Sequence, residues 1–234
     1  MAVEKVALIT AAGKGMGAAI ARELAAQGYR LALMSPSGSA SALATELGGF
    51  GMTGSVTEAT DIDRFVQGTL DKYGRIDAVV NNTGHPPKGD LLSIDDEQWH
   101  LGLDIIVLNV ARVLRRVTPA FLAQGGGAVV NISSFAADAP EQAMPVSSAL
   151  RAALSSFTRL YADRYAKDNI RINSVLPGFI DSWPETPDIV ARIPVGRFGK
   201  TGEIAKTVAF LLSDGAGYIT GQNIRVDGGI VRAL

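Results

Sequence analysis

The chain has 234 residues with 22 basic and 23 acidic side chains, so its formal net charge is −1. Hydrophobic residues make up 47% of the sequence and charged residues 19%, which suits one α/β domain and is too apolar for a disordered chain. The near-neutral charge argues against nucleic acid or an anionic membrane as a partner, and the absence of cysteine excludes disulfides, thiolate metal sites and a cysteine nucleophile.

Metal binding and membrane insertion are also disfavoured. His85 and His100 are the only histidines, which leaves little for a zinc site, so we expect no metal. No apolar run approaches the roughly 18 residues that a membrane-spanning helix needs. Glu4 and Lys14 interrupt the short apolar start, which is unlike a signal peptide. We therefore expect a soluble, cytoplasmic protein.

Short apolar runs alternate with longer helical patterns along the chain, which predicts parallel strands joined by crossover helices. The predicted strands cover residues 3–10, 29–34, 76–81, 128–133, 170–176 and 223–226, with a weaker strand at 49–53. The predicted helices cover residues 15–27, 37–47, 57–73, 96–122, 144–167 and 201–213. Because no repeat or linker interrupts this order, we expect a single α/β domain over residues 1–234.

The first strand leads directly into a glycine-rich turn and a helix. The turn reads Ala11-Ala12-Gly13-Lys14-Gly15-Met16-Gly17. Small residues let the backbone approach a diphosphate, and the following helix offers amide donors and a favourable dipole at its N-terminus. A tight turn without a ligand is the alternative, but the strand–turn–helix context is the one that dinucleotide binding requires.

Four further motifs follow the glycine turn in chain order. They are Asn81-Asn82-Thr83-Gly84, Val130-Asn131-Ile132-Ser133-Ser134, Pro177-Gly178-Phe179-Ile180-Asp181-Ser182, and an ending that runs from Tyr218 to Gly229. Together with the turn, in which Ala11 replaces a first glycine, they resemble the classical short-chain dehydrogenase/reductase family over essentially the whole chain. The resemblance implies a Rossmann-like, doubly wound parallel sheet with a nicotinamide dinucleotide across the carboxyl ends of its strands.

The resemblance also implies which residues contact the dinucleotide. The glycine turn would hold the pyrophosphate. The Asn81–Gly84 segment (the second motif, counting the turn as the first) would flank the adenosine, and the Pro-Gly segment would face the nicotinamide half. Carried over by position, the cofactor-binding residues are Gly13, Lys14, Gly15, Met16, Ser35, Asn82, Gly84, Arg151, Pro177, Gly178, Ile180 and Ser182. Ser55, followed by Val56, stands where the family often has an aspartate beside the adenine, which weakens one hydrogen bond there.

The phosphate form of the cofactor is favoured by the end of the second strand. Ser35-Pro36-Ser37 carries no carboxylate that would repel a 2′-phosphate, and Lys14 in the glycine turn could pair with one. An exposed turn lysine without a ligand is the alternative reading of Lys14. We therefore expect NADP(H) over NAD(H).

Three of the four catalytic positions that the resemblance implies have changed. The family uses a tyrosine as acid/base, a lysine four residues later, a serine thirteen residues before the tyrosine, and an asparagine on the preceding helix. Ser134 is present, whereas Ser147 stands at the tyrosine position and Arg151 at the lysine position. The asparagine position falls on Ile106, three residues before Asn109.

These changes leave the proton donor undecided. A serine hydroxyl is far less acidic than a phenol with a pKa of about 10, and an arginine stays charged, although it can anchor a ribose or a phosphate. His85 directly follows the second motif and titrates near neutral pH, so it is a candidate replacement; a stiff surface loop is the alternative. Asp138 and Glu141 border the expected cleft, where solvated loop carboxylates are the alternative.

Two functions therefore remain open. The first is an NADP(H)-dependent oxidoreductase of a small carbonyl or alcohol, with Ser134 polarising the oxygen and His85 or water supplying the proton. The second is a non-catalytic homologue that binds a dinucleotide or small ligand as a sensor or scaffold. A short substrate lid is expected at about residues 182–197.

The long predicted helices 96–122 and 144–167 resemble those that form dimer interfaces in the family. Ala152, Ala153, Phe157 and Leu160 supply an apolar stripe on the second of them, although packing within the chain would also use such a stripe. The resemblance implies a homodimer or homotetramer.

Overall fold

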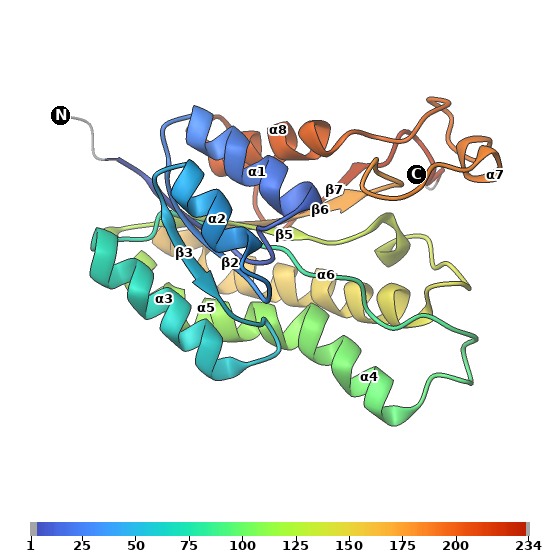
Figure 1. The fold of residues 1–234 in the computed structure, drawn as a ribbon, viewed down its shortest axis with the longest axis horizontal. Helices are drawn as coiled ribbons and strands as arrows, with labels where there is room; N and C mark the ends of the chain where they lie inside the picture. Colours follow the sequence, from blue (N-terminus) through green and yellow to red (C-terminus); the bar gives the residue numbers. More distant parts are fainter. Residues whose placement is uncertain (1–3, 233–234) are drawn as a thin grey trace.

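The structure is a computed structural model and describes residues 4–232 (Figure 1). Its centre is a seven-stranded parallel sheet in the order β3-β2-β1-β4-β5-β6-β7. The strands are β1 Val6–Ile9, β2 Arg30–Ser35, β3 Phe50–Thr53, β4 Ala78–Asn81, β5 Gly127–Ile132, β6 Ile170–Pro177 and β7 Asn223–Val226. The predicted Rossmann-like, doubly wound sheet is thereby confirmed.

Helices cover both faces of the sheet (Figure 1). They are α1 Gly15–Ala26, α2 Ser39–Glu46, α3 Ala59–Tyr73, α4 Asp96–Leu103, α5 Asn109–Gln124, α6 Pro145–Tyr165, α7 Pro187–Val190 and α8 Thr201–Leu212. Helices α1, α2 and α8 enclose one apolar core against the sheet, and α3, α5 and α6 enclose a second core on the other face. Since both faces are covered, most strands are apolar throughout.

The strand order reverses between β1 and β4, which lie side by side although β2 and β3 follow β1 in the chain. In an open parallel sheet this reversal leaves a crevice outside the carboxyl ends of the strands, where ligands bind. The glycine turn after β1 and the motif after β4 both end at this crevice. Topology therefore brings together segments that are about 70 residues apart in sequence.

The predicted ends of the elements hold with local exceptions. The first strand begins at Val6 rather than at residue 3, which lies outside the described residues. The short helix α7, inside the predicted lid, was not anticipated from the sequence. Among residues 4–232, every helix is too short or too polar to cross a bilayer.

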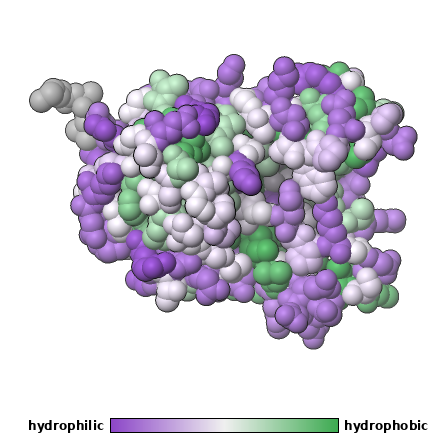
Figure 2. Space-filling model, viewed as in Figure 1, coloured by the Kyte–Doolittle hydropathy of each residue, from purple (hydrophilic) through white to green (hydrophobic). Residues whose placement is uncertain are grey.

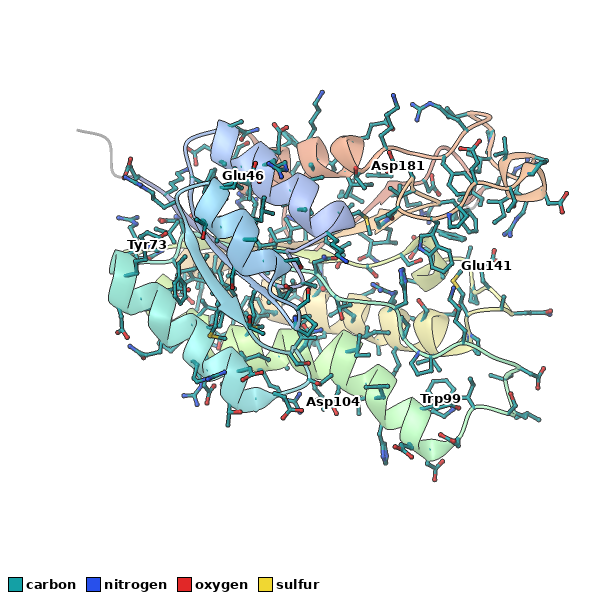
Figure 3. All side chains as sticks on the ribbon, viewed as in Figure 1. Glu46, Tyr73, Trp99, Asp104, Glu141 and Asp181 are labelled. Atoms are coloured by element: carbon teal, nitrogen blue, oxygen red, sulfur yellow. The ribbon has the colours of Figure 1, made fainter. Side chains whose placement is uncertain are left out.

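The predicted helix over residues 96–122 forms, but it is not a regular α-helix throughout. A π-helical turn at Asp104–Leu108 separates α4 from α5. The side-chain amide of Asn109 donates to the carbonyl of Ile105, and Asp104 pairs with Arg112 at 2.7 Å (Figure 3). The Asn109 side chain competes with the backbone for the carbonyl of Ile105, which disturbs the regular hydrogen bonds of an α-helix. A single π-helical turn is a common form of such a disturbance.

Ala11 adopts a left-handed backbone conformation with φ of +46°. An L side chain in this region clashes with its own carbonyl, which costs about 1–2 kcal/mol, whereas glycine is free of the clash. Ala12, the next residue, is fully buried and keeps a negative φ. Glycine is therefore the better residue for the backbone conformation at position 11, and alanine is the better residue at position 12.

We predict that Ala11→Gly raises the free energy of unfolding by about 1 kcal/mol and Tm by roughly 2–4 °C. Ala12→Gly is the matched control and should lower stability, because it adds chain entropy and removes buried contacts. Thermal and urea unfolding of both variants measure this. A lower Tm for Ala11→Gly than for the unaltered chain would contradict the strain.

Candidate functional site

A cavity opens at the crevice beyond the carboxyl ends of β4, β5 and β6. Its empty volume is about 830 Å³, the solvent at its mouth included. All four residues predicted for catalysis line it, namely His85, Ser134, Ser147 and Arg151. So do eight of the fourteen predicted cofactor-binding residues, namely Arg151 again and Met16, Asn82, Gly84, Pro177, Gly178, Ile180 and Ser182. The structure therefore brings most of the predicted site residues to one place.

Six predicted cofactor residues lie beyond this cavity, along the glycine turn and the ends of β2 and β3. They are Gly13, Lys14, Gly15, Ser35, Ser55 and Val56. A Cβ on Gly15 would stand 3.6 Å from Cβ of Ser182, so the turn adjoins the cavity directly. The side chain of Lys14 is exposed and does not cap α1, which leaves the first amides of that helix without a side-chain acceptor.

The end of β2 carries a cluster of hydroxyl groups. Ser35 Oγ donates to the carbonyl of Ser37 at 2.7 Å, and the hydroxyls of Ser37 and Ser39 are 2.7 Å apart. A Cβ placed on Gly13 would lie 2.0 Å from Ser39 Oγ, so only glycine fits against this cluster. The glycine turn is thereby packed against the residues that were expected to choose between NAD and NADP.

Arg151 is buried at the cavity wall, with 7% of its surface exposed. Its Nε donates to Ser147 Oγ at 3.1 Å, and its Nη1 donates to the carbonyl of Ile132 at 2.8 Å. The four-residue spacing on α6 places the two side chains on one face of the helix. Burial lowers the pKa of Arg151 to about 10, which still leaves it a cation at neutral pH. Both acceptors are neutral groups.

Two hydroxyl groups without partners line the same cavity as this cation. Ser133 Oγ and Thr83 Oγ1 are buried and make no hydrogen bond to the described residues. Both residues line the cavity. Buried hydroxyls are normally bonded, so their free groups suit a ligand or a bound water. Sequence reasoning missed them, although Ser133 directly precedes Ser134 and Thr83 lies inside the second motif.

The Ser134 hydroxyl lies at the cavity and accepts one hydrogen bond from its own loop. Its Oγ accepts from the backbone N–H of Ala136 at 3.2 Å, at the start of a 3₁₀ turn over Phe135–Ala137. With that acceptance made, its O–H remains available to donate to a group in the cavity. This is the geometry that a residue polarising a carbonyl oxygen needs.

An aromatic and basic cluster forms one side of the cavity. The rings of His85 and Trp183 meet edge to face with centroids 4.7 Å apart, and Lys88 Nζ lies 3.7 Å from the centre of the Trp183 ring. Burial, followed by the charges of Lys88 and Arg151, lowers the pKa of His85 below its usual value. The cluster links the loop after β4 to the expected lid, and Lys88 was not singled out from the sequence.

The loop carboxylates considered as catalysts are held in ion pairs outside the cavity lining. Asp138 accepts from Arg225 Nε at 2.7 Å, and Glu141 pairs with Arg192 on the segment that carries α7 (Figure 3). Both side chains are about a fifth exposed and paired with arginines, and neither lines the cavity, so they are not placed for proton transfer there. The Glu141–Arg192 pair joins the lid to the loop that follows Ser134.

The positions related to the missing asparagine do not contribute to the cavity. Ile106 is 1% exposed in the second core, and Asn109 is buried with its amide used in the π turn. Neither lines the cavity.

Comparison with known proteins decides the family. The family model described as enoyl-(acyl carrier protein) reductase matches residues 10–231. The chain is 34% identical to the 3-oxoacyl-[acyl-carrier-protein] reductase FabG of Staphylococcus aureus, over 98% of this chain and 99% of that protein. The chain belongs to the classical short-chain dehydrogenase/reductase family.

Two further relatives agree with this assignment. A 3-oxoacyl-[acyl-carrier-protein] reductase of Synechocystis is 35% identical, over 97% of each chain. The crystal structure of a protein described as a short-chain dehydrogenase/reductase from Burkholderia xenovorans superposes with a TM-score of 0.92, at 31% identity and over 99% of this chain and 98% of that one. This short-chain dehydrogenase/reductase therefore shares the family fold from end to end.

A buried chain of polar side chains positions α6, and with it Ser147 and Arg151. Asn81 Nδ2 donates to Asn131 Oδ1 at 2.8 Å, and Asn131 Nδ2 donates to Thr158 Oγ1 at 3.0 Å. Thr158 Oγ1 lies 3.2 Å from Ser174 Oγ. These hydrogen-bonded side chains connect β4, β5, α6 and β6. Asn131 is at their centre and is fully buried.

In this short-chain dehydrogenase/reductase we predict that Asn131→Ala lowers the free energy of unfolding by about 3 kcal/mol, because two buried partners lose their hydrogen bonds. Ser156→Ala, on the exposed side of α6, is the matched control and should stay within about 0.5 kcal/mol. Urea unfolding measures both. Equal stability of the two variants would show that the polar chain does not hold α6.

Proposed function

We propose that this short-chain dehydrogenase/reductase is an NADP(H)-dependent oxidoreductase that reduces a small carbonyl or oxidises an alcohol at an atypical active site. The observation that carries the proposal is the cavity at the crevice of the sheet. There the glycine turn adjoins Ser134, His85 and the buried pair of Ser147 and Arg151.

The residues present fit a dinucleotide. A Cβ on Gly17 would lie 2.3 Å from the carbonyl of Ala11, so α1 packs close to β1 and directs its first amides to the crevice. Ser133 and Thr83 supply unpaired hydroxyls on the cavity wall. The predicted cofactor residues would hold the group along this line, from Ser35 and Lys14 at one end to Ile180 and Ser182 at the other. When bound, the nicotinamide supplies the hydride chemistry.

Preference for the phosphate form is supported by the end of β2. Residues 35–39 carry hydroxyls and no acidic side chain, and Lys14 is exposed beside them. A 2′-phosphate needs hydrogen-bond donors and a nearby cation, and it avoids carboxylates. The serine cluster and Lys14 meet both conditions.

The substrate oxygen would lie between two serine hydroxyls. Ser134 accepts from Ala136, and Ser147 accepts from Arg151, so each retains an O–H to donate. Two such donors stabilise the negative charge that develops on a carbonyl oxygen during reduction, or hold an alcohol oxygen during oxidation. Arg151 fixes the Ser147 hydroxyl in place and does not itself move a proton.

His85 is the side chain in the cavity best suited to exchange the substrate proton. Its lowered pKa keeps the imidazole neutral at physiological pH, and neutral imidazole accepts a proton. In alcohol oxidation it would take the hydroxyl proton, and in carbonyl reduction the protonated ring would return it. Trp183 positions the ring by edge-to-face contact.

The surroundings of the site support a short lid and an oligomer. The segment 182–197 borders the cavity through Trp183 and is tied down by the Arg192–Glu141 pair. On the outer side of α6, Ala152 and Ala153 are exposed and Leu160 is 66% exposed, whereas Phe157 packs partly into the core. This apolar face suits pairing with a second copy, as a homodimer or homotetramer.

A second candidate is a homologue that binds the dinucleotide or a small ligand without turning it over. The observation that favours it is that none of the described residues lining the cavity is a tyrosine. Without a phenol, catalysis depends on His85 or water. Binding of NADPH with no turnover of any carbonyl or alcohol in a broad panel would support this candidate against the first.

We predict that the purified protein binds NADPH at least about tenfold tighter than NADH, and that Lys14→Met removes most of this difference by weakening NADPH alone. Fluorescence titration with both nucleotides measures it. Lys206→Met, which removes an exposed lysine from α8, is the matched control and should change neither affinity. Equal affinity for the two nucleotides in the unaltered protein would contradict the NADP preference.

We predict that alcohol oxidation falls as pH drops through the lowered pKa of His85, below the ordinary histidine value near 6.5, because protonation removes the base. His85→Gln should abolish this acidic limb and lower the rate while leaving the affinity for NADPH unchanged. A pH–rate profile of both proteins tests the role. An acidic limb that persists unchanged in the variant would assign it to another group.

A further inference from the structure

We propose that the cavity binds ligands that carry a carboxylate, and that Arg151 is the residue that holds the carboxylate. As a substrate class, this rests on the oxidoreductase function proposed above; as a binding site, it stands without that function.

The first support is the uncompensated charge of Arg151. Its side chain donates hydrogen bonds to the Ser147 hydroxyl and the Ile132 carbonyl, which are both neutral. Among residues 4–232, no carboxylate forms an ion pair with it. A guanidinium has five N–H donors, and a buried cation is unfavourable unless an anion accompanies it. The geometry therefore leaves room for one negative charge beside Arg151.

The second support is the sign of the charges around the cavity. Among the described residues that line it, Lys88 and Arg151 carry positive charge, His85 is neutral because its pKa is lowered, and none is acidic. The nearby carboxylates of Asp138 and Glu141 are engaged by Arg225 and Arg192. A concave site lined by one sign of charge attracts ligands of the other sign. The electrostatic field of the cavity therefore favours anionic ligands.

The third support is the shape of the free space. Ser147 and Arg151 both line the cavity, so free space lies beside the small serine side chain and the guanidinium. The planar fork of an arginine matches a planar carboxylate, and one buried cation balances a single negative charge. Phe135, Phe179 and Trp183 also line the cavity and offer apolar contacts. The ligand that fits is a small monocarboxylate with a short apolar body.

The test compares benzoate with benzamide, which has the same shape and no charge. Isothermal titration of the unaltered protein, with and without saturating NADP+, should show benzoate binding at least about tenfold tighter than benzamide. Arg151→Met should weaken benzoate by about 30-fold or more and leave benzamide unchanged. Arg159→Met, which removes an exposed arginine from the same helix, is the matched control and should change neither.

Equal affinity for the two probes in the unaltered protein would overturn the inference, and this comparison does not depend on the folding of any variant. Undiminished benzoate binding by folded Arg151→Met would overturn it as well. NADPH binding without selectivity for benzoate would leave the proposed oxidoreductase standing and remove the carboxylate site. Benzoate selectivity without binding of either nucleotide would leave the carboxylate site and remove the oxidoreductase.

Discussion

The arrangement of the cavity at the carboxyl ends of the strands depends on one constraint. The guanidinium of Arg151 is buried there without a carboxylate partner among the described residues. Removing Arg151 from water lowers its pKa to about 10, because the charged form loses its hydration. A fold tolerates such a cost where it serves a ligand. The Ser147 hydroxyl and the Ile132 carbonyl accept hydrogen bonds from that cation, and the unpaired hydroxyls of Ser133 and Thr83 line the same polar wall of the cavity.

The sheet sets where this wall stands. Parallel strands place the ends of β4, β5 and β6 at one edge, and the buried chain through Asn131 and Thr158 fixes α6 against them. Hydrophilic residues cover much of the face in Figure 2, with smaller apolar patches between them. Helix α6, which is fixed against the sheet, carries Arg151 and Ser147, whereas loops carry His85, Lys88 and Trp183. In the proposed reaction, the rigid part holds the substrate and the loop part exchanges the proton.

The fold, and the gathering of most candidate site residues at one cavity, could be predicted from the sequence for physical reasons. Apolar strands buried on both faces leave little ambiguity, and parallel topology brings the ends of β1, β4, β5 and β6 together. Features that depend on partners distant in sequence could not be predicted. The Asp138–Arg225 pair spans 87 residues, and nothing local to either residue indicates it. The π turn depends on how the Asn109 side chain competes for a backbone carbonyl, which hydrophobic periodicity does not report.

A crystal structure of the protein grown with NADP+ and benzoate would test the central claim most directly. We expect the benzoate carboxylate against the guanidinium of Arg151, with the nicotinamide beside Ile180 and Ser182 and the 2′-phosphate near Lys14. A benzoate bound elsewhere, with Arg151 still joined only to Ser147 and Ile132, would contradict it.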